Sequence, residues 1–149
     1  KYIYARAAAN GKRAQCQGGA KNPAVIMPDA DMEMTSRILT DSAFGCAGQR
    51  CLAISSVVTV GDARQEFTER MVASASGRKV GYGLTDGIDM GPVITKESKE
   101  RILGLVEKGK SEGAKVLVGG GEGDHFFAAF FAPEPGAISV IRTRVRPWR

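Results

Sequence analysis

A cysteine in the segment FGCAGQRC, residues 44–51, is the strongest candidate for chemistry in this sequence. Cys51 follows a short glycine-bounded loop and precedes a β-branched run, a junction at which a thiol can be exposed at a strand edge. The preceding helix and the neighbouring Arg50 favour an ionised thiol, and the thiolate is the nucleophilic form. A free cysteine is more often a small buried hydrophobic residue, so the local pattern leaves both interpretations open.

The other residue types limit the kind of site. Cys46 and Cys51 have a C-x4-C spacing, but zinc takes about four ligands and the single histidine, His125, lies near the C-terminal end, so we expect no metal. For the same reason a cysteine or serine hydrolase would lack its histidine base. Neither glycine-rich stretch, 77–83 or 119–123, is followed by the helix that a dinucleotide fingerprint requires.

Apolar spacing and turn residues predict alternating helices and strands. Asp29 is expected to cap a helix whose first turn carries Asp31 and Glu33. Cys16 falls in an expected strand and is predicted to be a core residue. This alternation predicts an α/β fold with a parallel-type sheet covered by helices. The expected helices are 1–10, the segment after Asp29, 63–76 and 96–111, and the expected strands are 13–17, 23–27, 53–60 and 115–118.

Composition places the chain among ordinary soluble proteins. It has 149 residues, of which 43% are hydrophobic and 25% charged, and a net charge of +5. Four arginines lie in residues 142–149, and without them 17 basic side chains face 16 acidic ones, so we expect no nucleic-acid partner. Three cysteines do not suggest a disulfide framework. The longest apolar run, 126–132, is too short to span a membrane, so a cytoplasmic protein, or a mitochondrial one in a eukaryote, is expected.

Several strings together resemble the aldehyde dehydrogenase superfamily. GGAKNPAVIMPDAD, residues 18–31, ends 20 residues before Cys51, and DMGPVIT follows at residues 89–95. The GAKN and GQRC forms resemble the CoA-acylating methylmalonate-semialdehyde dehydrogenases. The resemblance covers about residues 1–118 and implies a partial catalytic domain of a family that forms homo-oligomers. It divides the chain into a remnant of the NAD-binding domain (1–19), the N-terminal half of the catalytic domain (20–121) and a divergent tail (122–149).

The resemblance also implies roles for individual residues. Cys51 matches the nucleophile, which forms a thioester while hydride passes to NAD, and its N–H matches an oxyanion donor. Gln17, 34 residues earlier, stands where hydrolytic members carry a glutamate that activates water. An amide cannot accept that proton, which agrees with release of the acyl group by CoA. Arg50 is expected to hold a substrate carboxylate, whereas Lys21 and Asn22 are expected to shape the loop.

The implied function is NAD-dependent oxidation of methylmalonate or malonate semialdehyde to an acyl-CoA, with the isolated fragment expected to be inactive. One alternative is a noncatalytic α/β fragment or a partner of a full-length subunit. Others are a hydrolytic aldehyde dehydrogenase relative and a nucleic-acid binder that uses the arginine-rich tail.

Overall fold

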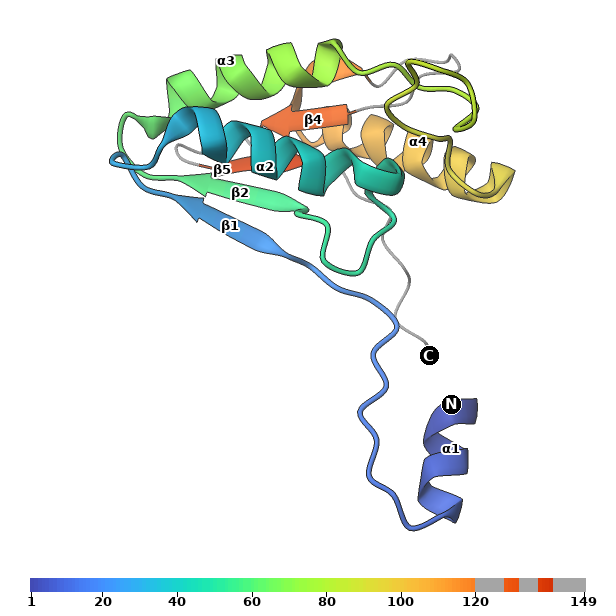
Figure 1. Cartoon of the computed structure of the whole chain (residues 1–149). Helices are drawn as coiled ribbons and strands as arrows, with labels where there is room; N and C mark the ends of the chain where they lie inside the picture. Colours follow the sequence, from blue (N-terminus) through green and yellow to red (C-terminus); the bar gives the residue numbers. More distant parts are fainter. Residues whose placement is uncertain (120–127, 132–136, 141–149) are drawn as a thin grey trace.

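The computed structural model describes residues 1–119, 128–131 and 137–140 (Figure 1). In these ranges one mixed sheet has the strand order β1-β2-β5-β4-β3. Its strands are β1 (Pro23–Ile26), β2 (Ser56–Thr59), β3 (Lys115–Gly119), β4 (Ala128–Phe131) and β5 (Ala137–Val140). The helices are α1 (Tyr2–Ala9), α2 (Met32–Phe44), the 3-10 turn η1 (Gly45–Gly48), α3 (Ala63–Ser76) and α4 (Lys96–Ser111). None of the helices in the described ranges is long and apolar enough to cross a membrane.

The sheet combines two kinds of strand pairing. β1 and β2 are parallel, with Ala24 opposite Val57, and α2 forms the crossover between them. The β2–β5, β4–β5 and β3–β4 pairs are antiparallel. A parallel pair needs a crossover of about a dozen residues or more, whereas consecutive strands with short connections pair antiparallel. The expected α/β class is therefore confirmed, and the parallel arrangement holds for β1 and β2.

Two helices cover one face of the sheet, with α2 over β1 and β2 and α3 in contact with β3. α2 and α3 lie side by side there (Figure 1). Phe67 of α3 and Val57 of β2 are almost completely buried between these layers, and each such side chain stabilises the fold by roughly 1.5–3 kcal/mol. The buried Thr40 hydroxyl donates to the Ser36 carbonyl at 2.6 Å, so the hydroxyl keeps a hydrogen-bond acceptor when it is buried.

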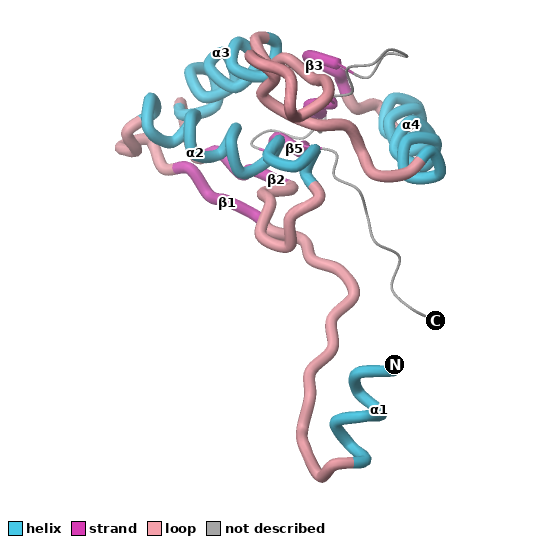
Figure 2. The backbone as a smooth tube through the Cα atoms, turned by 45° about the vertical axis from the view of Figure 1, so that its right-hand side comes forward, coloured by secondary structure: helices cyan, strands magenta, loops and turns pink. Residues whose placement is uncertain are grey.

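The segment between α1 and β1 differs from expectation. The predicted strand 13–17 is absent, and Cys16 is exposed rather than in the core. A strand needs a neighbouring strand for its main-chain hydrogen bonds, and Figure 2 shows this segment as a loop running from α1 to the sheet without one beside it. The predicted strand 53–60 is also shorter, at Ser56–Thr59. His125 and residues 142–149 lie outside the described residues.

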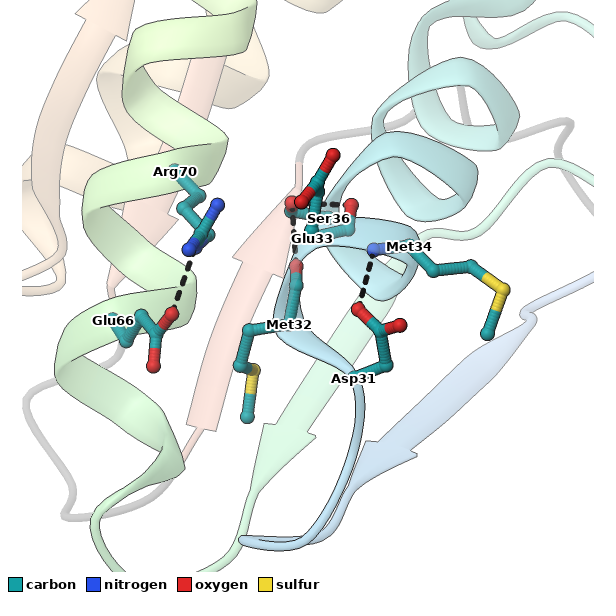
Figure 3. Close-up of polar contacts among 7 residues, drawn as sticks. All are labelled: Asp31, Met32, Glu33, Met34, Ser36, Glu66 and Arg70. Atoms are coloured by element: carbon teal, nitrogen blue, oxygen red, sulfur yellow. Dashed lines mark hydrogen bonds and ion pairs between the residues drawn. The ribbon is translucent and has the colours of Figure 1, made fainter.

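The N-terminal cap of α2 is Asp31, not Asp29. The Asp31 Oδ1 accepts a hydrogen bond from the Met34 N–H at 2.9 Å (Figure 3). Asp29 lies earlier in the turn that follows β1, and its side chain is exposed. The acidic residues of DAD could be recognised as capping residues from sequence, but the position of the first helical turn decides which of them caps.

Replacing the cap tests this assignment. Asp31→Ala removes the acceptor and should lower the free energy of unfolding by about 1 kcal/mol. Asp29→Ala, which makes the same chemical change two residues earlier, should leave it nearly unchanged. Urea denaturation followed by circular dichroism measures both variants. Equal losses in the two variants would show that the cap has been assigned to the wrong residue.

Candidate functional site

The loop after α2 brings Cys51 to the surface. Cys46 and Ala47 have φ of 52° and 54°, and Gly48 has φ of 70°. These three left-handed residues turn the chain back after α2, a conformation that costs residues other than glycine roughly 1–2 kcal/mol each. Cys51 follows in a turn with an exposed side chain. Figure 1 shows this loop beside the end of the sheet at which β1 and β2 begin.

Asn22 ties this loop to the start of β1. Its Nδ2 donates to the carbonyl oxygens of Cys51 and Ala53, each at 2.9 Å. Its main-chain N–H donates to the Ser55 Oγ at 2.9 Å, and the Ser55 N–H donates to the Asn22 carbonyl at 3.0 Å. These contacts confirm the prediction that Asn22 shapes the loop. Lys21 beside it is exposed.

Gln49 joins the same loop to the segment that contains DMGPVIT. Its Nε2 donates to the Cys46 carbonyl at 2.8 Å, and its Oε1 accepts from the Ile94 N–H at 3.3 Å. Sequence reasoning did not assign this residue a role. Its place within GQRC, two residues before Cys51, was the available signal. The two motifs are therefore in direct contact in the structure.

Arg50 lies against the turn that precedes it. Its Nε–H donates to the Cys46 Sγ at 3.3 Å. A Cβ built on Gly45 would lie 2.7 Å from the Arg50 Nη1, so the glycine leaves the space that this guanidinium occupies. The Arg50 side chain is exposed, as binding of a carboxylate from solvent requires. In this arrangement the Nε–H is directed at Cys46, whereas the sequence had suggested that Arg50 assists Cys51.

Gln17 is exposed on the segment that leads from α1 to Asn22. Among the residues that the structure describes, no hydrogen bond joins Gln17 to the Cys51 loop. The structure thus places Asn22 in contact with the loop that carries Arg50 and Cys51, and it leaves Gln17 outside that network. The thiols of Cys16, Cys46 and Cys51 are all exposed, so solvent access alone does not distinguish them.

Metal-binding residue types are dispersed in the described part of the chain. There, no group of three or more His, Cys, Asp or Glu side chains is placed to hold a metal ion. The Cys46 sulfur is instead an acceptor for Arg50. The chemistry available at this loop is that of an exposed thiol next to a guanidinium.

The chain that carries this loop is similar to proteins of a known family. The sequence model of the aldehyde dehydrogenase family matches residues 1–134. Malonate-semialdehyde dehydrogenase 1 of Geobacillus thermodenitrificans is 47% identical over 123 residues, which are 83% of this chain and 25% of that protein. The acylating, mitochondrial methylmalonate-semialdehyde dehydrogenase of Arabidopsis thaliana is 48% identical over 119 residues, 80% of this chain and 19% of that protein.

Solved structures agree at the level of the fold. The betaine aldehyde dehydrogenase of Staphylococcus aureus, in complex with NAD+, is 29% identical and superimposes with a TM-score of 0.73. The match covers 87% of this chain and 27% of that one. The chain spans about a quarter of the length of the curated relatives that it matches.

Proposed function

Because the chain belongs to the aldehyde dehydrogenase family, we propose that it contributes the nucleophile, Cys51, to NAD-dependent and CoA-dependent oxidation of malonate or methylmalonate semialdehyde. The observation that carries this proposal is the exposed Cys51 thiol in a loop held by Asn22 and Gln49. The relatives named for these two semialdehydes support the substrate class.

The residues of the loop suit attack on a carbonyl carbon. The Cys51 Sγ would form the new carbon–sulfur bond, and the carbonyl electron pair would move onto oxygen, where a main-chain N–H can stabilise it. Bound NAD would supply the hydride acceptor. No G-x-G-x-x-G motif of the dinucleotide type occurs between a strand and a helix among the described residues.

Release of the acyl group depends on Gln17 in this proposal. The uncharged amide cannot take a proton from water, so the Cys51 thioester persists until another nucleophile reaches it. The thiol of CoA would attack the thioester carbonyl, and Cys51 would leave as its thiolate. The product is then an acyl-CoA. The name of the acylating Arabidopsis relative supports this choice over hydrolysis.

A graft tests the proposed activity. Residues 1–118 replace the matching stretch of the Geobacillus relative, and NADH formation and acyl-CoA are measured with each semialdehyde. We expect turnover that requires CoA and no turnover from the 149-residue chain alone. Turnover that proceeds equally without CoA and yields the free acid would support a hydrolytic relative instead. A graft that folds and shows no oxidation would favour a noncatalytic role.

Arg50 provides a separate test of the substrate class. In the grafted enzyme, Arg50→Gln should raise the KM for malonate semialdehyde about 10- to 100-fold, because a charge-assisted hydrogen bond contributes roughly 1.5–3 kcal/mol. The KM for propanal, which carries no carboxylate, should not change. Steady-state kinetics with both aldehydes measures the difference. A similar rise for propanal would mean that Arg50 maintains the loop rather than binding the carboxylate.

For the whole protein we propose a homo-oligomer without nucleic-acid or membrane partners. Its expected location is the cytoplasm of a bacterium or the mitochondrion of a eukaryote. The mitochondrial location stated in the name of the Arabidopsis relative supports the second possibility.

A further inference from the structure

We infer that Asn22 is a positioning residue for Cys51, because its side-chain amide holds the carbonyls of Cys51 and Ala53 and thereby fixes the turn in which the thiol lies. The inference rests on the proposed role of Cys51 as the nucleophile. It adds a function for Asn22: aiming the Cys51 N–H at the oxygen of the carbonyl group under attack.

Both peptide planes that flank Cys51 are restrained. The plane after Cys51 contains its carbonyl, which accepts from the Asn22 Nδ2 at 2.9 Å. The plane before it contains the Arg50 carbonyl and the Cys51 N–H. The Arg50 carbonyl accepts from the Ala53 N–H at 3.3 Å, and the Ala53 carbonyl accepts from the same Asn22 amide at 2.9 Å. One planar amide therefore restrains the turn that sets the direction of the Cys51 N–H.

The amide is itself anchored on a rigid element. The Asn22 main chain exchanges hydrogen bonds with Ser55, whose side chain is fully buried. The next residue, Pro23, opens β1 and is paired in register with Ser56 of β2. A functional group supported by paired strands is held more accurately than one supported by a loop alone. The paired strands thus fix the position of Asn22, and the Asn22 amide in turn fixes the main chain at Cys51.

The direction of the Cys51 N–H matters for only one class of reaction. When a thiolate attacks a carbonyl carbon, negative charge develops on oxygen, and a preorganised N–H lowers the barrier. When the same thiolate displaces iodide from iodoacetamide, no oxyanion forms. None of the described residues accepts a hydrogen bond from the Cys51 N–H. The ratio of the acylation rate to the alkylation rate at Cys51 therefore reports the orientation of this N–H separately from the accessibility of the thiol.

The test compares these two reactions in the 149-residue chain. With p-nitrophenyl acetate, the Cys51 Sγ bonds to the acetyl carbon and p-nitrophenolate leaves; with iodoacetamide, the Sγ bonds to the methylene carbon and iodide leaves. Peptide mass spectrometry gives both rates at Cys51. Asn22→Leu, of similar size without donors, and Asn22→Asp, of the same shape without donors, should each lower the ratio about tenfold, less than the loss of a whole oxyanion donor.

Asn10 offers a matched control. Its Nδ2 also donates to a main-chain carbonyl, that of Arg6, at 2.8 Å, but it lies at the end of α1. Asn10→Leu should leave the ratio unchanged. An unchanged ratio in folded Asn22 variants, or an equal fall in Asn10→Leu, would overturn the inference. Circular dichroism checks the fold, and Asn22→Asp decides the matter if Asn22→Leu does not fold.

A spectroscopic measurement separates this inference from the proposed function. The chain has three cysteines, so labelling with 15N-cysteine gives three amide signals, assigned by Cys→Ser variants. Asn22→Leu should shift the Cys51 signal and leave those of Cys16 and Cys46 in place; an unshifted Cys51 signal overturns the inference. A wild-type Cys51 that acylates no faster than Cys16 would contradict the nucleophile proposal, and the amide signal alone then decides whether Asn22 positions the main chain.

Discussion

Replacing Cys51 by serine in the grafted enzyme should lower the kcat for malonate semialdehyde by about 10³-fold or more, since loss of the nucleophile removes covalent catalysis as a whole. A serine hydroxyl without a neighbouring base is scarcely ionised at neutral pH, and the grafted residues 1–118 contribute no histidine to act as that base. NADH formation under saturating substrate measures the loss. The exposed position of the side chain makes the substitution compatible with an intact fold.

Cys46→Ser is the matched control for this prediction. It makes the same change of sulfur to oxygen five residues earlier, in the same loop, and the serine Oγ can still accept the Arg50 Nε–H. Activity should stay close to that of the unsubstituted graft. Loss of activity in both variants would indicate damage to the loop, and full activity in Cys51→Ser would remove Cys51 from the mechanism.

Gln17→Glu should divert product from acyl-CoA to the free acid. A carboxylate at this position can accept a proton from water, and general base catalysis contributes about 10²-fold or more to such a step. Hydrolysis of the thioester should rise by about that factor and compete with CoA. The measurement is the ratio of free acid to acyl-CoA formed by the grafted enzyme at a fixed concentration of CoA.

Gln15→Glu separates this chemical effect from added charge. Gln15 is exposed on the same segment, two residues before Gln17, so the variant carries the same charge without the same position along the chain. It should leave the product ratio as it was. If both variants shift the ratio equally, position 17 has no special role, and if neither does, the choice between CoA and water is made elsewhere.

Local patterns were sufficient for most of the helices. The apolar spacing of Phe67 and Met71 and the stop at Gly77 predicted residues 63–76, the bounds of α3. Local patterns also predicted strands at β1, β2 and β3, but the segments that the sequence misassigned depended on information from distant parts of the chain. Residues 13–17 have strand-like composition but no partner, whereas β4 lies in an apolar run that has no clear period and pairs with both β3 and β5. Whether such a segment forms a strand depends on the strands that pair with it, and these pairings are not evident from a single sequence.

The sequence likewise predicted some features of the candidate site and not others. The sequence placed Arg50 beside Cys51 and matched Asn22 to a loop-shaping motif. It could not show that the Asn22 amide reaches the Cys51 carbonyl across 29 residues. It also could not show that Arg50 points to Cys46, because that direction follows from the left-handed backbone of Cys46 and Ala47. Contacts that depend on backbone turns or on strand pairing emerged only from the structure.

The link between Asn22 and the Cys51 loop has a consequence for folding. Its hydrogen bonds join residues 29 to 33 positions apart, and the whole of α2 lies between them. Closing so long a loop costs chain entropy that the local turn cannot offset, so the loop reaches its native geometry only when β1 has paired with β2. Amide hydrogens of the turn at Ala53 and of β2 should therefore exchange in one cooperative unit, and a substitution that unpairs the two strands would disorder the reactive loop without touching it.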